Sequence, residues 1–120
     1  MTAEETVDAF LAAVGRKDMD AALALLAEDV EYDNVPMPTV HGRQATKDFL
    51  EPFLGPAEQV EWVVHRQAVN GNVVFNERTD RFLLNGSWME IPVVGVWEVG
   101  GDGLISLWRD YFDVGMIAGG

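Results

Sequence analysis

Apolar residues near the start of the chain recur at the spacing of an amphipathic helix. Thr2 and Glu5 stand three positions apart, which is the spacing of a capping box at a helix N-terminus. The apolar positions that follow are Val7, Phe10, Leu11 and Val14. They fit the i, i+3, i+4, i+7 pattern of one helix face, and Gly15 ends the run. The pattern therefore predicts a first helix that ends at Gly15.

Three shorter elements follow this helix. Asp18 has the position of an N-cap for a second short helix. The apolar face of that helix would hold Met19, Ala22, Leu23 and Leu26. Residues 30–35 predict a short strand, which ends at Pro36 and Pro38. Residues 42 to 54 predict a third helix, with Ala45, Phe49 and Phe53 on its apolar side and Pro52 in its last turn.

The second half of the chain has the pattern of β-strands. Asn70-Gly71 and Asn85-Gly86 separate runs rich in valine, phenylalanine and tryptophan, and Asn-Gly is the strongest short signal for a β-hairpin. The glycine-rich stretch 100–103 marks a third reversal. We expect four antiparallel strands over residues 60–69, 72–84, 87–99 and 104–113. Helices followed by such a sheet predict an α+β fold in a single domain, residues 1–120. The N-terminal helices would pack on a strongly curved, mostly antiparallel sheet that forms a cone with an internal pocket.

Composition narrows the classes of function. The chain has 120 residues, 8 Lys and Arg against 20 Asp and Glu, a net charge of −12 and no cysteine. This acidity argues against nucleic acid or an anionic membrane as a partner, because both attract clustered basic residues. The two histidines, His41 and His65, are separated and lack cysteine partners, so we expect no metal. The glycines at 100–103 form no Gly-x-Gly-x-x-Gly motif before a helix, so we also expect no cofactor. An acidic N-terminus and the lack of a long apolar run favour a cytoplasmic location.

Alternation along the predicted strands gathers polar side chains on one face. In the strand 72–84 that face carries Val74, Asn76, Arg78, Asp80, Phe82 and Leu84. In the last strand it carries Leu104, Ser106, Trp108, Asp110 and Phe112, and Tyr32 and Asn34 share a face of the short strand. If these faces point inwards, Arg78 lies between two carboxylates whose charges it balances. Such a set can keep one carboxyl group as acid and the other as base. A buried ion pair with a purely structural role is the alternative, and spacing alone does not decide between them.

Three segments of the chain resemble the limonene-1,2-epoxide hydrolases. They are residues 32–36 (Tyr-Asp-Asn-Val-Pro), 76–80 (Asn-Glu-Arg-Thr-Asp) and 108–113 (Trp-Arg-Asp-Tyr-Phe-Asp). That family belongs to the cone-shaped nuclear-transport-factor-like domains, together with polyketide cyclases and ketosteroid isomerases. The resemblance implies that Asp110 is a general base, that Asp80 is a general acid and that Arg78 bridges them. Tyr32 and Asn34 would position the attacking water. The short ends of this chain leave open how the pocket is closed.

The function implied by this resemblance is hydration of an epoxide to a vicinal diol in one step, without a covalent intermediate. The aromatic residues expected to line the pocket are Phe82, Trp108 and Phe112, which favours a medium to bulky apolar epoxide as substrate. The resemblance also implies a homodimer. The outer face of the predicted sheet, with Leu83, Met89, Ile105 and Leu107, is apolar enough to form one. Two alternatives stay open: a related polyketide cyclase or isomerase, and a non-catalytic module that binds a small molecule.

Overall fold

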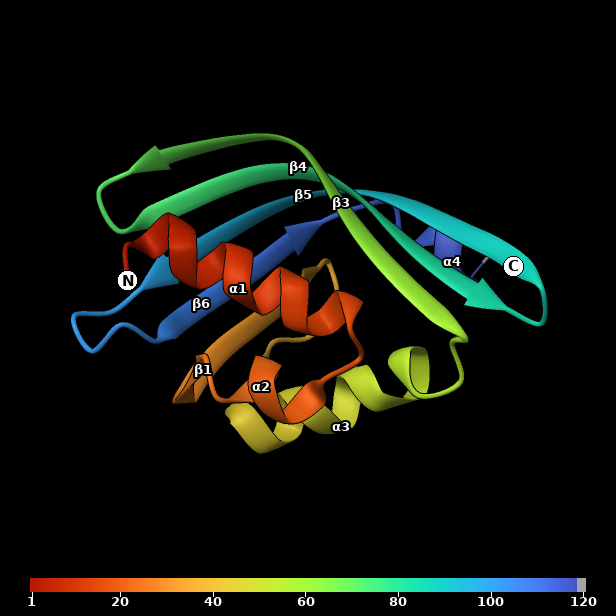
Figure 1. Ribbon diagram of the computed structural model, residues 1–120, viewed down its shortest axis with the longest axis horizontal. Helices are drawn as coiled ribbons and strands as arrows, with labels where there is room; N and C mark the ends of the chain where they lie inside the picture. The colour runs from red at the N-terminus through yellow and green to blue at the C-terminus, as the bar shows by residue number, and fades with distance from the viewer. Residues whose placement is uncertain (119–120) are drawn as a thin grey trace.

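A computed structural model describes residues 1–118 of the chain (Figure 1). In chain order its elements are α1 (Ala3–Gly15), α2 (Met19–Leu23), β1 (Leu26–Val35), β2 (Val40–His41), α3 (Arg43–Leu54), β3 (Gln59–Asn70), β4 (Val73–Leu84), β5 (Ser87–Val99), β6 (Ile105–Tyr111) and α4 (Gly115–Ala118). The strands form a six-stranded sheet in the order β2-β1-β6-β5-β4-β3. All neighbours are antiparallel except β1 and β6, which run parallel.

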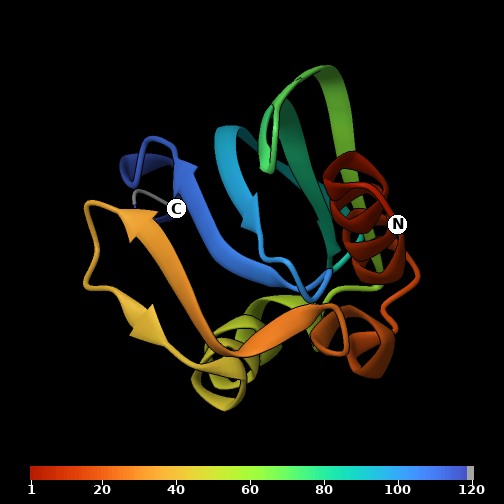
Figure 2. The same cartoon turned by 90° about the vertical axis from the view of Figure 1, so that its left-hand side faces the viewer.

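The sheet is strongly curved, and the three N-terminal helices lie on its concave side (Figures 1 and 2). Helix α1 packs against β3, and α3 packs against β1 at the other end of the curve. The core between them is aromatic. The ring of Phe10 meets those of Trp97 and Trp108 edge-on, at centroid distances of 5.5 and 5.0 Å. The predicted α+β architecture, with helices on a curved and mostly antiparallel sheet, is confirmed.

The predicted capping box forms at the start of α1. The Thr2 side chain accepts a hydrogen bond from the Glu5 backbone N–H, and the Glu5 carboxylate accepts one from the Thr2 backbone N–H. The apolar stripe predicted for this helix is buried, and Asp18 caps α2 as expected. Both helix starts are local features, because the side chain that caps each helix bonds to a backbone group within four residues of it in the sequence.

The β4–β5 hairpin fixes which side chains face the interior. Its ladder runs without a bulge from Val73 opposite Glu98 to Leu84 opposite Ser87. Asn85 and Gly86 make the turn with φ of 51° and 77°, the left-handed conformation that a two-residue hairpin needs. The pleat therefore alternates along all of β4. Its buried residues are Val74, Asn76, Arg78, Asp80 and Phe82, as the alternation predicts.

Strand β1 and its neighbours differ from the prediction. The strand begins at Leu26, four residues earlier than expected, so Leu26 belongs to the sheet and not to α2. The two-residue strand β2, in which His41 pairs with Glu31, was not predicted. Strand β6 ends at Tyr111, two residues earlier than predicted. The start of β1 and the end of β6 depend on the pairing of these two strands, which lie far apart in the sequence and which local sequence does not specify.

A bulge in β6 changes the outer face that the sequence predicts. Between the pairings of Ile105 and Leu107, β6 has one residue more than β5, and the extra residue is Ser106. Ile105 is consequently fully buried. Met89 also packs against the core, because it lies opposite the inward-facing Phe82. The prediction that Ile105 and Met89 belong to the outer face was wrong.

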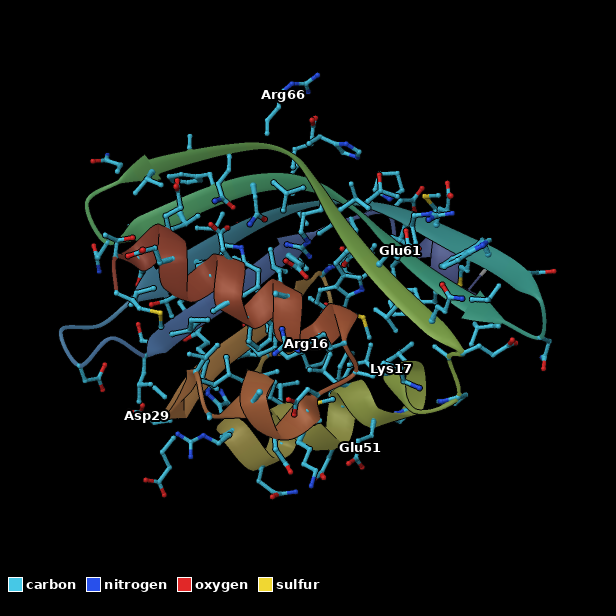
Figure 3. All side chains as sticks on the ribbon, in the orientation of Figure 1. Arg16, Lys17, Asp29, Glu51, Glu61 and Arg66 are labelled. Atoms are coloured by element: carbon cyan, nitrogen blue, oxygen red, sulfur yellow. The ribbon has the colours of Figure 1, made fainter. Side chains whose placement is uncertain are left out.

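Charged side chains outside the buried cluster on β4 and β6 include several that project away from the core. Arg66 on β3 and Glu51 on α3 point outwards from the convex face and from the helical layer, respectively (Figure 3). In the described part of the chain, no helix is both long enough and apolar enough to cross a membrane.

Candidate active site

A cavity of about 200 Å³ lies between α3, the sheet and the segment that follows β6. Its polar lining residues are Tyr32, Asn34, Asp80 and Asp110. The other lining residues are apolar or aromatic. The cavity thus combines an apolar wall with a small convergent set of polar groups, which is typical of a small-molecule site.

Behind these polar groups, Arg78 joins the two carboxylates. Its Nε and Nη2 donate to the two oxygens of Asp80 at 2.9 and 3.1 Å, and Nη2 also donates to Asp110 Oδ2 at 2.9 Å. The three residues are 1%, 6% and 4% exposed in the order Arg78, Asp80, Asp110. At this burial solvent cannot balance their charges, so each depends on the others. The arrangement holds two carboxylates against one cation.

Burial and the neighbouring charges shift the pKa values of the groups in this cluster. Burial raises the pKa of Asp80 to about 6, although Arg78 opposes the shift. Burial lowers the pKa of Arg78, but the charges of Asp110 and Asp80 outweigh it and raise that pKa above its usual value, so Arg78 stays charged. Burial and the nearby Asp110 raise the pKa of Tyr32, so its phenol stays neutral. The cation of Arg78 and a proton on Asp80 can therefore balance the charge of the buried cluster.

The parallel pairing of β1 and β6 brings the other two predicted residues to the same place. Tyr32 pairs with Trp108, and Asn34 pairs with Asp110. The Tyr32 hydroxyl donates to Asn34 Oδ1 at 3.2 Å, which leaves the Asn34 amide nitrogen without a partner among residues 1–118. The Trp108 indole N–H donates to Asp110 Oδ1 at 2.9 Å. A hydrogen-bond donor and a carboxylate on adjacent strands thus face the cavity together.

The aromatic lining differs in part from the sequence expectation. Phe82 and Phe112 line the cavity, but Trp108 does not. The Trp108 ring is fully buried, because it stacks between the rings of Tyr32 and Trp97 at centroid distances of 4.0 and 5.0 Å. Trp108 touches the site through its hydrogen bond to Asp110 and does not border the cavity.

Other aromatic lining residues were not identified as site residues from the sequence. They are Trp62 on β3 and Phe49 and Phe53 on α3. The apolar side of the predicted third helix was the available signal for the two phenylalanines. That pattern does not distinguish a side chain that fills the core from one that borders a cavity.

The chain is similar to proteins of one family along nearly all of its length. A family model described as the limonene-1,2-epoxide hydrolase catalytic domain matches residues 1–119. The epoxide hydrolase EphG of Mycobacterium tuberculosis is 39% identical over 108 residues, which cover 90% of this chain and 71% of that protein.

Solved structures agree with these matches. The structure of a limonene-epoxide-hydrolase-like epoxide hydrolase of M. tuberculosis has a TM-score of 0.84 and 38% identity, covering 98% of this chain and 87% of that one. An NTF2-like protein from Cytophaga hutchinsonii has a TM-score of 0.79 at 23% identity, covering 98% of this chain and 96% of that one. The second likeness concerns the fold alone.

Proposed function

The chain belongs to the limonene-1,2-epoxide hydrolase family, and on this premise we propose that it adds water to an apolar epoxide in one step and releases a vicinal diol. Epoxide hydrolysis follows from the family. The residues that perform it and the kind of epoxide are our proposal. The observation that carries it is Arg78, buried between Asp80 and Asp110 beside an apolar cavity.

Asp80 acts as the general acid. An epoxide oxygen is a poor leaving group unless it receives a proton while the C–O bond breaks. The raised pKa of Asp80, about 6, keeps a usable fraction of this carboxyl group protonated near neutral pH. Arg78 stays charged beside it and stabilises the carboxylate that remains after proton transfer.

Asp110 acts as the general base on a bound water molecule. Each oxygen of Asp110 already accepts one hydrogen bond, from Arg78 and from Trp108, and a carboxylate oxygen has a second lone pair. The water donates one hydrogen to Asp110 and the other to the Tyr32 oxygen. It accepts a hydrogen bond from the Asn34 amide, which leaves one water lone pair free to attack the epoxide carbon. After turnover the proton gained by Asp110 returns to Asp80, either past Arg78 or through solvent.

The cavity walls determine the kind of epoxide. Phe49, Phe53, Phe82 and Phe112 present rings or ring edges and offer no ion pair to a substrate. Burial of apolar surface is then the main source of binding free energy. We propose a medium to bulky apolar epoxide, of the size of a terpene-derived or lipid-derived one, as the substrate class.

The proposed reaction is tested with a panel of apolar epoxides. We expect diol formation, measured by gas chromatography and mass spectrometry, from at least one bulky apolar epoxide. A single turnover in ¹⁸O water, with enzyme in excess, should place ¹⁸O in the diol and leave the protein unlabelled. Unlabelled diol in the first turnover would show that a protein carboxylate supplied the oxygen. No diol from any epoxide would favour the cyclase, isomerase or binding-module alternatives.

We also propose that two copies of the chain associate through the convex face of the sheet. Phe75, Val94 and Tyr111 are 42%, 47% and 46% exposed on that face, where Val94 and Tyr111 are direct neighbours in the β5–β6 ladder. An exposed apolar patch on adjacent strands favours association. Light scattering after size exclusion should give twice the 13.3 kDa chain mass, and Val94→Glu should give the monomer. Val69→Glu, at an equally exposed site on the opposite face, serves as the control. A monomeric wild type would contradict this proposal.

A further inference from the structure

The guanidinium of Arg78 is also held on the side that faces away from the carboxylates. Its Nη1 donates to Asn76 Oδ1 at 3.0 Å, and the Trp97 indole N–H donates to the same oxygen at 3.1 Å. Both groups can only donate, so they fix which end of the amide faces Arg78. The Asn76 amide nitrogen donates to Gln67 Oε1 at 3.2 Å, and Gln67 donates to Asp8 on α1 at 3.0 Å. A chain of hydrogen bonds thus connects the buried arginine to the helical layer.

Gly95 faces the same guanidinium from β5. It lies in the ladder between Asn76 on β4 and Asp110 on β6. A β-carbon at this position would lie 2.5 Å from Arg78 Nη1, 2.8 Å from Asn76 Oδ1 and 2.9 Å from the Trp97 indole nitrogen. The φ of Gly95 is not positive, so other residues could adopt its backbone conformation. Glycine is therefore needed here for space, and the space is taken by the end of the Arg78 side chain.

We propose that Asn76 and Gly95 are positioning residues for the hydration reaction, an inference that rests on the proposed function. Gly95 leaves room for the guanidinium, and Asn76 holds its Nη1 end. Together they keep the Nε and Nη2 edge turned towards Asp80 and Asp110. Neither residue lines the cavity, so both act through Arg78 and not on the substrate.

Moving the Arg78 guanidinium would change the pKa of Asp80 as well as the geometry of the hydrogen bonds. The titratable groups around it are Asp80 on β4, Asp110 on β6 and Tyr32 on β1, with Asp8 of α1 at the end of the hydrogen-bond chain. Burial raises the pKa of Asp80 and Arg78 lowers it. If Arg78 shifts away, it lowers the pKa of Asp80 less, so this pKa rises further above its usual value. The protonated acid then persists to higher pH.

Gly95→Ala and Asn76→Ala test this inference through kcat, KM and the pH profile of kcat. In the wild type, kcat should fall as the pH rises through about 6, the pKa of Asp80. In each variant we expect kcat on the acidic plateau to fall by about 10²-fold, because reacting groups misplaced by about 1 Å lose that much. KM should change by no more than about twofold, since substrate contacts are kept. The alkaline decline should move upwards by on the order of one pH unit.

Gly101→Ala is the matched control. A β-carbon at Gly101 would have no neighbour within 4 Å, so this variant should keep the wild-type rate and profile. Circular dichroism confirms that each variant is folded, and if one variant fails to fold the other decides. A folded variant with wild-type kcat, or with lower kcat and an unshifted profile, would overturn the positioning role. A wild type that forms no diol overturns the proposed function instead.

Discussion

Replacing Asp110 with asparagine should lower the rate of diol formation by about 10²–10⁴-fold, the usual contribution of one positioned proton transfer. Asparagine keeps the shape of the side chain but cannot take a proton from water. It also has one oxygen where Asp110 uses two, to accept from Arg78 and from Trp108. We therefore expect a loss of about 1–3 kcal/mol in the free energy of unfolding, which leaves the protein folded. Steady-state assays and urea unfolding measure the two effects separately.

Asp113→Asn is the control for this substitution. Asp113 lies three residues further along, is exposed, and accepts a hydrogen bond from the Gly115 backbone N–H. Its replacement should leave the rate within about twofold of wild type, as expected for a surface change away from the site. The sequence favours Asp110 over Asp113 as the base because alternation separates their faces. A fully active Asp110→Asn, or an inactive Asp113→Asn, would contradict that assignment.

Replacing Arg78 with methionine should destabilise the protein more at high pH than at low pH. At about pH 8 the variant leaves Asp80 and Asp110 buried without their cation, and we expect a loss of about 3–5 kcal/mol in the free energy of unfolding. Without the cation, the folded-state pKa of a buried carboxyl group rises far above its unfolded value. The folded state then binds protons that the unfolded state releases, so stability is lost as the pH rises. At about pH 5 protonation relieves much of the loss.

Arg81→Met, three positions along the same strand, provides the comparison. Arg81 pairs with Glu61 and Glu90, whose side chains are 45% and 54% exposed. Ion pairs at such exposure contribute little, so we expect a much smaller loss of stability than for Arg78→Met and little dependence on pH. Urea unfolding of wild type and both variants at the two pH values gives the required differences. A pH-independent effect of Arg78→Met would show that the two carboxyl groups do not depend on Arg78 for their charge balance.

The sequence predicts the parts of the fold and of the site that local rules determine. The Asn85-Gly86 turn sets a hairpin without a bulge, so counting by twos along β4 correctly places Arg78 and Asp80 inside. The same counting fails at Ser106, because a bulge depends on how two distant strands come into register. The predicted single domain over residues 1–120 and the cytoplasmic location stay predictions.

The contacts that surround the site are harder to read from the sequence. The steric role of Gly95 can be seen only once the Arg78 side chain is known to occupy the space above it. Likewise, the sequence predicts that the Trp108 ring lines the pocket. Its stacking between two other rings is a property of the packed core. Long-range side-chain geometry of this kind leaves no periodic signal along the chain.

The polar groups and one part of the cavity wall come from different parts of the fold. Tyr32, Asn34, Asp80 and Asp110 come from strands β1, β4 and β6 of the sheet, whereas Phe49, Phe53 and Phe112 come from α3 and from the segment after β6. On the proposed mechanism, substitutions in α3 and in the segment after β6 can therefore alter which epoxides the cavity binds, while the residues proposed to hydrate the epoxide stay unchanged. Such a division lets relatives diverge in selectivity through a few changes, and it makes α3 and the chain after Tyr111 the places to redesign preference for one epoxide over another.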